Sequence, residues 1–295
     1  MNRLFPAALF AALLVSTAAD ASTFAPVTKK CAVGGEKFRF FEQMSSTSFG
    51  QLPDGMTVGT GPNPPTLPQC PKNGLVMYRD FDAATVKALA SIIATPEYQS
   101  LRATETPYYL AYWLARKLGD ETPAWLLLAA GWEAKNEDPV SQRARRYAEE
   151  FIALVATTPV SDTSLESVAL RARAANALRE TGKFADAEAL RASIRIAADA
   201  GGPDSADNAD NRKGWTDFLT LLAAPIARGD SARAPIDMVG TREAAFRCIA
   251  PLMKRDATAL QVPPLTAFEV SYCAKPDIAE AVVKLKDQLG DRLAQ

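Results

Sequence analysis

The chain has 295 residues, a formal net charge of −1 and no histidine. Hydrophobic residues make up 48% of it and charged residues 23%, close to the averages of soluble globular proteins. The balanced charge gives no electrostatic case for nucleic acid or an anionic membrane as a partner. The lack of histidine excludes a Ser-His-Asp triad, a Cys-His pair and histidine-bound zinc or haem.

The first 21 residues have the pattern of a secretory signal peptide. Arg3 precedes an apolar stretch from Leu4 to Ala19, and Ala19-Asp20-Ala21 has the small-x-small pattern of a cleavage site. The apolar stretch is shorter than the roughly 20 residues that a membrane-spanning helix needs, which favours cleavage after Ala21 over an uncleaved anchor. We therefore expect a periplasmic or secreted protein without a membrane span.

Residues 22–81 predict a small module of strands and loops. They are rich in glycine and proline and include the run GTGPNPPTLP from Gly59 to Pro68. Two short segments have the alternation of strands, Lys37–Met44 and Leu75–Phe81. After Phe81 the pattern changes to alanine-rich helical periodicity, which places a domain boundary there.

Residues 82–200 predict helical hairpins, because capping signals recur along the alanine-rich stretch. Asp82 can cap a helix that runs to about Ala94. The sequence from Thr163 to Glu166 has the pattern of a capping box, and Gly201-Gly202 marks a helix end. Three further helix starts pair a capping residue with proline at the first helical position: Thr106-Pro107, Thr122-Pro123 and Asp138-Pro139.

The remainder divides into a polar linker, residues 201–212, and a C-terminal helical region, residues 213–295. Successive helices joined by short turns make antiparallel hairpins, and hairpins in series build a solenoid. The predicted fold class is therefore mainly α, an α-helical hairpin solenoid preceded by the small β module. The helices expected in the last region are Lys213–Ala223, Thr241–Arg255, Leu265–Tyr272 and Asp277–Leu293.

One hairpin, from Ala169 to Ile194, resembles a tetratricopeptide repeat. The segment GKFADAE carries most of the resemblance, and Arg171 stands where the repeat consensus has tryptophan. The resemblance implies close packing of two helices, since small residues let their axes approach. The matching residues are a small and an apolar residue of the first helix, a glycine at the turn, and an aromatic and a small residue of the second helix: Ala175, Leu178, Gly182, Phe184 and Ala187.

Two similar segments, KKCAVGGEKF and LPQCPKNGLV, each hold one cysteine, Cys31 and Cys70. Gly34 and Asn73 stand where a zinc knuckle would have its second cysteine. Together with the helical segment Tyr108–Lys135, the pattern resembles a bacterial family of unknown function that has a CxxC…CxxC zinc-ribbon-like module before tetratricopeptide-like helices. The family implies zinc, but here only two thiolates remain where zinc needs about four ligands.

The four cysteines allow three disulfide connectivities. An exported protein favours disulfides over free thiols, and we favour local pairing, Cys31 with Cys70 and Cys248 with Cys273. The knuckles would then be a degenerate zinc ribbon held by a disulfide, and neither a metal nor another cofactor is expected.

Aromatic residues gather between positions 108 and 132, where those four residues apart share a helix face. Such a cluster is most often the core of a hairpin. Its members are also the candidates for binding a partner: Tyr108, Tyr112, Trp113 and Trp132.

Two classes of function remain. The first is a helical-repeat scaffold that binds a protein or peptide partner in the cell envelope and needs no catalytic group. The second is an enzyme that acts on cell-wall glycan through a glutamic acid. Glu133 and Glu269 are its candidate acids, although no local pattern singles out either of them. We favour the scaffold.

Overall fold

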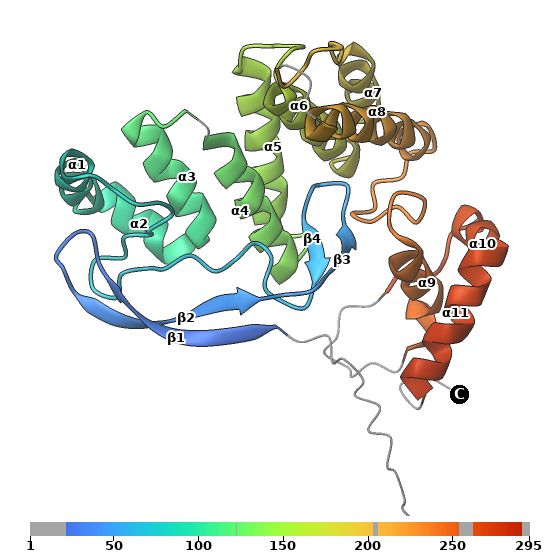
Figure 1. Cartoon of the computed structure of the whole chain (residues 1–295), viewed down its shortest axis with the longest axis horizontal. Helices are drawn as coiled ribbons and strands as arrows, with labels where there is room; N and C mark the ends of the chain where they lie inside the picture. Colours follow the sequence, from blue (N-terminus) through green and yellow to red (C-terminus); the bar gives the residue numbers. More distant parts are fainter. Residues whose placement is uncertain (1–21, 122, 203–205, 254–261, 291–295) are drawn as a thin grey trace, which may run out of the picture.

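The computed structural model describes residues 22–121, 123–202, 206–253 and 262–290. These ranges are mainly helical, as expected, with small antiparallel β pieces near the N-terminus. Figure 1 shows the helices from α1 to α8 in an arc, with a long β ribbon along its lower side. In these ranges no helix has both the length and the hydropathy needed to cross a bilayer.

The N-terminal module contains two separate strand pairs. Strands β1 (Thr23–Lys30) and β2 (Lys37–Ser45) form the antiparallel ribbon, and β3 (Ser48–Gln51) pairs with β4 (Thr57–Gly59). The strand predicted over Lys37–Met44 is confirmed as β2, whereas β1, β3 and β4 were not predicted.

The strand predicted over Leu75–Phe81 is wrong. Only Val76 bridges to another residue, Gln69, and no ladder extends from that bridge. The apolar residues of the segment, Leu75 and Val76, are fully buried in a core shared with α1 and α3. Burial against helices therefore explains their apolar character without a sheet.

Five helices follow: α1 (Ala83–Ile93), α2 (Pro96–Thr104), α3 (Pro107–Leu118), α4 (Pro123–Glu137) and α5 (Gln142–Thr157). The predicted caps at Asp82 and Thr106 are confirmed, because each side chain accepts a hydrogen bond from a backbone N–H of the first turn. The capping role predicted for Thr122 lies outside the described residues, although α4 does begin at Pro123.

Two other predicted helix starts are wrong. Asp138 accepts from Val140 N in a turn, and the cap of α5 is Ser141, whose hydroxyl accepts from Ala144 N. The predicted capping box at Thr163 does not form. Ser164 caps the next helix instead, and Glu166 is left to accept from a tryptophan.

Helices α6 (Leu165–Glu180), α7 (Phe184–Ser193) and α8 (Ala206–Ala227) continue the array. Gly182 turns the chain between α6 and α7, with φ of +79°, as predicted. The predicted end at Gly201 is wrong because α7 stops at Ser193. The predicted linker over 201–212 is also wrong, since its part from Ala206 onward is the first two turns of α8.

The last helices form a separate group at the right of Figure 1. They are α9 (Thr241–Ile249), the short 3₁₀ turn η1 (Ala250–Leu252), α10 (Ala267–Cys273) and α11 (Pro276–Leu289). Helix α9 stops at Ile249, before the predicted Arg255, at the turn that contains Pro251. The predicted ends at Arg255 and Leu293 lie outside the described residues.

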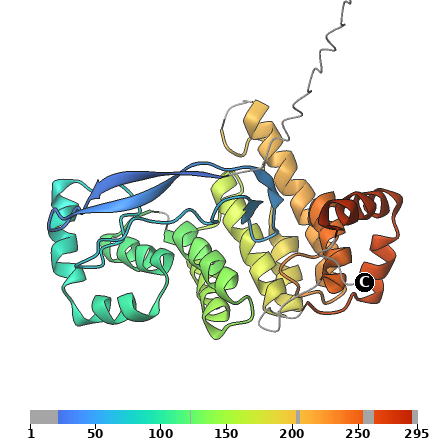
Figure 2. The same ribbon diagram turned by 90° about the horizontal axis from the view of Figure 1, so that it is seen from below.

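Each helix from α3 to α8 packs on the next one in the chain, and α6 also packs on α8. One core lies between α3, α4, α5 and α6, and a second lies where the cysteine turns meet α1, α2 and α3. The segment between β4 and α1 runs along these helices, on the side of the ribbon (Figures 1 and 2). The inner side of the array is therefore covered by the chain's own N-terminal module.

Candidate functional site

The inner side of the helical array holds the proline-rich N-terminal segment through its backbone carbonyl groups. Tyr108 on α3 donates to Pro65 O at 2.8 Å, and Trp132 on α4 donates to Asp54 O at 3.2 Å. Two further donors reach the same segment: Asn136 to Asn63 O at 2.6 Å and Arg173 to Pro53 O at 2.6 Å. Tyr108 and Trp132, two candidates for partner binding, are therefore engaged within the chain.

These contacts explain why a proline-rich segment lies here. Proline offers a carbonyl acceptor and no N–H, so such a segment needs donors from elsewhere when it is buried. The helices supply these donors from tyrosine, tryptophan, asparagine and arginine side chains. Residues 53–65 are thus held against the inner side of the helices.

Buried charges anchor the tip of the β3–β4 hairpin. Lys135 on α4 donates to Asp54 at 2.9 Å and to Glu180 on α6 at 2.5 Å, and all three side chains are almost excluded from solvent. Arg233 adds a longer contact to Asp54, at 3.4 Å. The ammonium group of Lys135 on α4 thus links the hairpin to α6.

The pKa directions agree with this arrangement. Burial alone would raise the pKa of Asp54, but the charges of Lys135 and Arg233 outweigh it and the pKa lies below its usual value. Burial alone would lower the pKa of Lys135, but Glu180 and Asp54 hold it above its usual value. The ion pair of Asp54 and Lys135 is therefore charged at neutral pH.

Two buried arginines of α6 bind backbone carbonyl groups of loops, and Arg179 also lies 3.7 Å from the Glu180 carboxylate. The guanidinium of Arg179 donates to the carbonyls of Asp230 and Ala232 at 2.6 and 2.8 Å. That of Arg173 lies 4.9 Å from the ring centres of Trp215 and Phe218, and burial lowers its pKa to about 10. Helix α6 therefore positions both the β3–β4 hairpin and the loop after α8.

The other two aromatic candidates, Tyr112 and Trp113, line an open pocket between α3 and α5. Its volume is about 280 Å³, and Arg116, Lys117 and Glu150 complete the lining. The Lys117 ammonium lies 4.8 Å from the centre of the Trp113 ring. We call this the α3–α5 pocket.

Hydrogen bonds fix the acidic side of the pocket. Glu150 accepts from the hydroxyls of Tyr109 and Tyr112 at 3.0 and 2.9 Å, and Arg116 donates to the Tyr112 hydroxyl at 3.2 Å. Burial, with Glu150 beside it, raises the pKa of Tyr109 to about 12. Burial also raises the pKa of Tyr112 above its usual value. Both phenols are therefore neutral donors, and the cations Arg116 and Lys117 line the pocket with Trp113.

No pattern in the sequence singles out Arg116, Lys117 or Glu150 as pocket residues. Arg116 and Lys117 follow Tyr112 and Trp113 by four residues, so the helical spacing could have joined them to the aromatic face. Glu150 comes from another helix, and no local pattern indicates that it meets Tyr112.

The structure gives the two candidate acids different environments. Glu133 accepts from Tyr108 N at the start of α3, at 2.8 Å, and burial raises the pKa of its carboxyl above the usual value. Burial would also raise the pKa of Glu269, but its bonds to Arg247 and to the Thr266 cap bring it below the usual value. Glu269 closes the capping box of α10.

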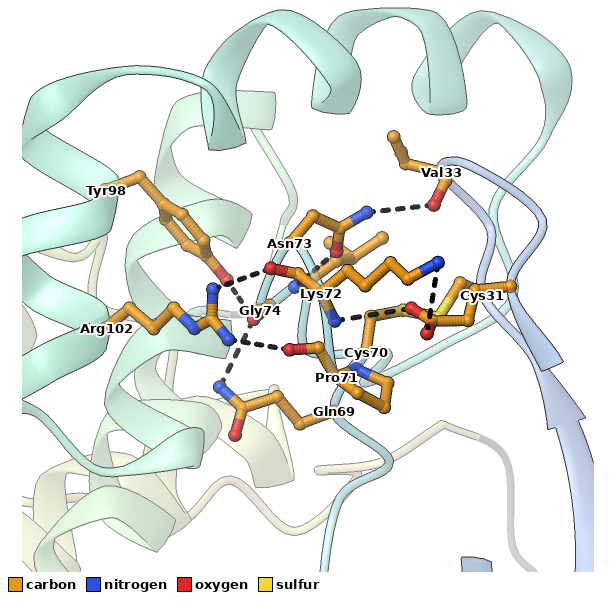
Figure 3. The surroundings of a disulfide bond; sticks show 12 residues. Cys31, Val33, Gln69, Cys70, Pro71, Lys72, Asn73, Gly74, Tyr98 and Arg102 are labelled. Carbon is orange, nitrogen blue, oxygen red and sulfur yellow. Dashed lines mark hydrogen bonds and ion pairs between the residues drawn. A yellow bond between two sulfur atoms is a disulfide. The ribbon is translucent and has the colours of Figure 1, made fainter. Parts of the chain in front are cut away.

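The two cysteine segments fold into matching turns joined by a disulfide (Figure 3). In each turn the cysteine N–H donates to the carbonyl five residues later, and the cysteine carbonyl accepts from a glycine N–H four residues later, at 2.8 to 3.2 Å. The Cα atoms of Cys31 and Cys70 are 5.7 Å apart, and those of Cys248 and Cys273 are 5.9 Å apart. The favoured disulfide pairing is confirmed.

The positions without a second cysteine have roles within these turns. Gly34 has φ of +86°, a conformation that glycine adopts without strain. Asn73 donates to Val33 O at 2.9 Å and so ties the second turn to the first (Figure 3). Both thiols are used in the disulfide and neither turn has another soft ligand, so these residues do not fit the zinc site that the family resemblance implies.

Helix α2 supports the second turn. Tyr98 donates to Gly74 O at 2.8 Å, and Arg102 donates to the carbonyls of Pro71 and Lys72 at 2.9 and 3.0 Å (Figure 3). Across the described ranges no group of three or more His, Cys, Asp or Glu side chains could hold a metal ion.

Four residues that the sequence singles out in the α6–α7 hairpin lie in one hydrophobic cluster. Ala175 of α6 and Ala187 of α7 are fully buried in one cluster with Leu178, and Phe184 packs against it. The cluster also includes Leu222 and Ile226 of α8. Small residues therefore lie where three successive helices come together.

No protein-family model, curated protein or solved structure matches this chain. The resemblances found in the sequence therefore stay predictions, and a proposal of function rests on the geometry of the chain itself.

Proposed function

We propose that this chain is an exported helical-repeat scaffold that binds a protein or peptide partner in the cell envelope through the α3–α5 pocket. The observation that carries the proposal is the pocket itself, where Trp113, Arg116 and Lys117 surround an open volume of about 280 Å³. The inner side of the helices does not serve the proposal, because residues 53–65 cover it.

The helical-repeat part of the proposal is supported by the packing order. The helices from α3 to α8 pack on their neighbours in sequence, and small residues lie at the α6–α7 contact. The predicted leader supports export. Export is also consistent with two disulfides and with the lack of a free cysteine among the described residues.

The chemistry of the pocket indicates what the partner presents there. Two cations and an indole favour a carboxylate beside an apolar side chain. The acid that lines the pocket, Glu150, is already bonded to two tyrosines. A carboxylate of the partner would replace the exposed 3.5 Å pair of Lys117 with Glu97. Helix α3 is capped and packed along its other face, so this surface is held in place before a partner arrives.

The test is a photo-crosslinking amino acid at position 113 in cells that export the protein. We expect one discrete crosslinked product at this position and a weaker one when Lys117→Glu is added, because the cation is replaced by an acid. Position 140 is the control, since Val140 is 84% exposed on a turn and does not line the pocket. No product at 113, or the same products at 113 and 140, contradicts the proposal.

The glycan-acting enzyme has one observation in its favour, the raised pKa of buried Glu133. Against it, the same carboxylate is bound by the first turn of α3. If purified protein releases soluble fragments from cell wall, and Glu133→Gln abolishes the release while the fold is kept, the enzyme replaces the scaffold as the proposed function.

A further inference from the structure

The outer face of the β1–β2 ribbon has a composition that the fold does not explain. In the antiparallel register, Pro26 lies opposite Phe41, Thr28 opposite Arg39 and Lys30 opposite Lys37. These residues share one face, because side chains alternate along a strand. The ribbon runs along the border of the molecule in both overall views (Figures 1 and 2).

One half of this face is apolar and open to solvent. Phe24 is 46% exposed and Phe41 is 56% exposed. Met44, 63% exposed, is the unpaired residue at the irregularity in the ribbon, where the register assigns it to neither face. The residues of the opposite face are less exposed, and among them Phe38 packs against the core around the first cysteine turn. Large apolar side chains thus gather on the side that faces water.

The other half is cationic. Lys30 and Lys37 are directly opposite each other, an arrangement that weakens strand pairing. Neither they nor Arg39 has a carboxylate partner within the described part of the chain. Arg39 lies 4.9 Å from the centre of the Phe41 ring, so the cationic half adjoins the apolar half.

The nearby acids do not neutralise these cations. Glu42 is the only acid of the two strands, and it lies on the opposite face, where it is bonded to Lys29 at 2.8 Å. Glu36, in the turn, accepts from Lys72 N at 3.3 Å. The outer face of the ribbon therefore carries a local excess of positive charge, although the net charge of the whole chain is close to zero.

We infer that the outer face of the ribbon binds an anionic lipid surface. Aromatic and other apolar side chains enter the headgroup region of a bilayer, while neighbouring lysine and arginine side chains attract anionic headgroups. The attachment would be peripheral and reversible.

An acidic protein strand is the competing occupant. Such a strand would pair with the free edge of β1 through backbone groups, and it would depend little on the exposed side chains of the outer face. The two occupants therefore respond differently to side-chain substitutions.

The experiment is vesicle flotation with the purified exported protein. Vesicles of phosphatidylethanolamine with one third phosphatidylglycerol are compared with vesicles of phosphatidylcholine alone. We expect binding to the anionic vesicles only, and weaker binding as salt is raised. Lys30→Gln with Lys37→Gln should weaken the partition about thirtyfold, the effect of two interfacial cations.

The apolar half is tested by Phe41→Ser, which should also weaken flotation. Matched controls are Val140→Ser for the exposed apolar residue and Lys87→Gln with Arg145→Gln for two exposed cations elsewhere. The inference is overturned if the protein floats with neither vesicle or equally with both. It is also overturned if the ribbon variants float like their controls, the result expected when only a protein strand uses the ribbon.

Discussion

Asp54 and Lys135 are joined by a 2.9 Å ion pair across 81 residues of sequence. The pair places the tip of the β3–β4 hairpin against α4, and Glu180 of α6 binds the same ammonium group. Since the hairpin begins the segment that covers the inner side of the helices, this buried cluster helps to hold that segment in place.

Replacing Lys135 should therefore destabilise the protein strongly. Lys135→Met leaves Asp54 and Glu180 as buried acids without their shared cation, and we expect a loss of about 3–5 kcal/mol in the free energy of unfolding. Urea denaturation measures it. The control is Lys117→Met, which breaks an exposed pair with Glu97 and should cost less than about 1 kcal/mol. Equal effects of the two substitutions would mean that the buried cluster is not important for stability.

Asp54 should make stability sensitive to acid. Its pKa is lower in the folded than in the unfolded protein, so its contribution is present above the unfolded pKa of about 4 and is lost as pH falls through the folded pKa. Asp54→Asn should be destabilising at neutral pH, and its difference from the parent should shrink on acidification. Denaturation curves from neutral pH to about 2 test this. A difference that stays constant over the range contradicts the ion-pair account.

Each disulfide should contribute to stability through the loop that it closes. Cys31 and Cys70 are 39 residues apart and Cys248 and Cys273 are 25 apart, which gives roughly 3–4 kcal/mol for each in the chain-entropy model. Replacing both cysteines of either pair by serine should lower the unfolding free energy by that amount.

The mass of the intact exported protein should show a start at Ser22 and no alkylation before reduction. Metal bound to free Cys31 and Cys70 would instead restore the zinc-ribbon interpretation.

Local signals predicted several helix caps and one helix turn of this fold correctly. Asp82 and Thr106 cap their helices as expected, and Gly182 turns between α6 and α7, because each acts through groups a few residues away. Where a competing cap was equally near, prediction failed, as at Ser141 and Ser164.

What the sequence could not show depends on long-range packing. Leu75 and Val76 have the apolar character of a strand but are buried by helices, and Glu150 enters the α3–α5 pocket from a different helix than the aromatic residues. The inner side of the helices, covered by the chain itself, is the clearest case. Tyr108 was a candidate for partner binding, and only the folded chain shows that its hydroxyl is bonded to Pro65 O.

Glu133 provides a further test that separates a structural role from a catalytic one. Its pKa is higher in the folded protein than the usual value of 4.5, so the folded state favours the protonated form. The parent should therefore lose stability as pH rises from about 4.5 through the folded pKa, and Glu133→Gln should not, because an amide carries no charge at any pH.

Denaturation of the parent and of the Glu133→Gln variant over this pH range measures the free energy of unfolding of each. The difference in unfolding free energy, variant minus parent, should rise with pH and then become constant. The amide of the Glu133→Gln variant keeps an oxygen that can accept from Tyr108 N, so α3 should stay folded and capped. A difference that falls with pH would mean that Glu133 is stabilised as a carboxylate by its neighbours, and the argument for a buried acid at this position would be wrong.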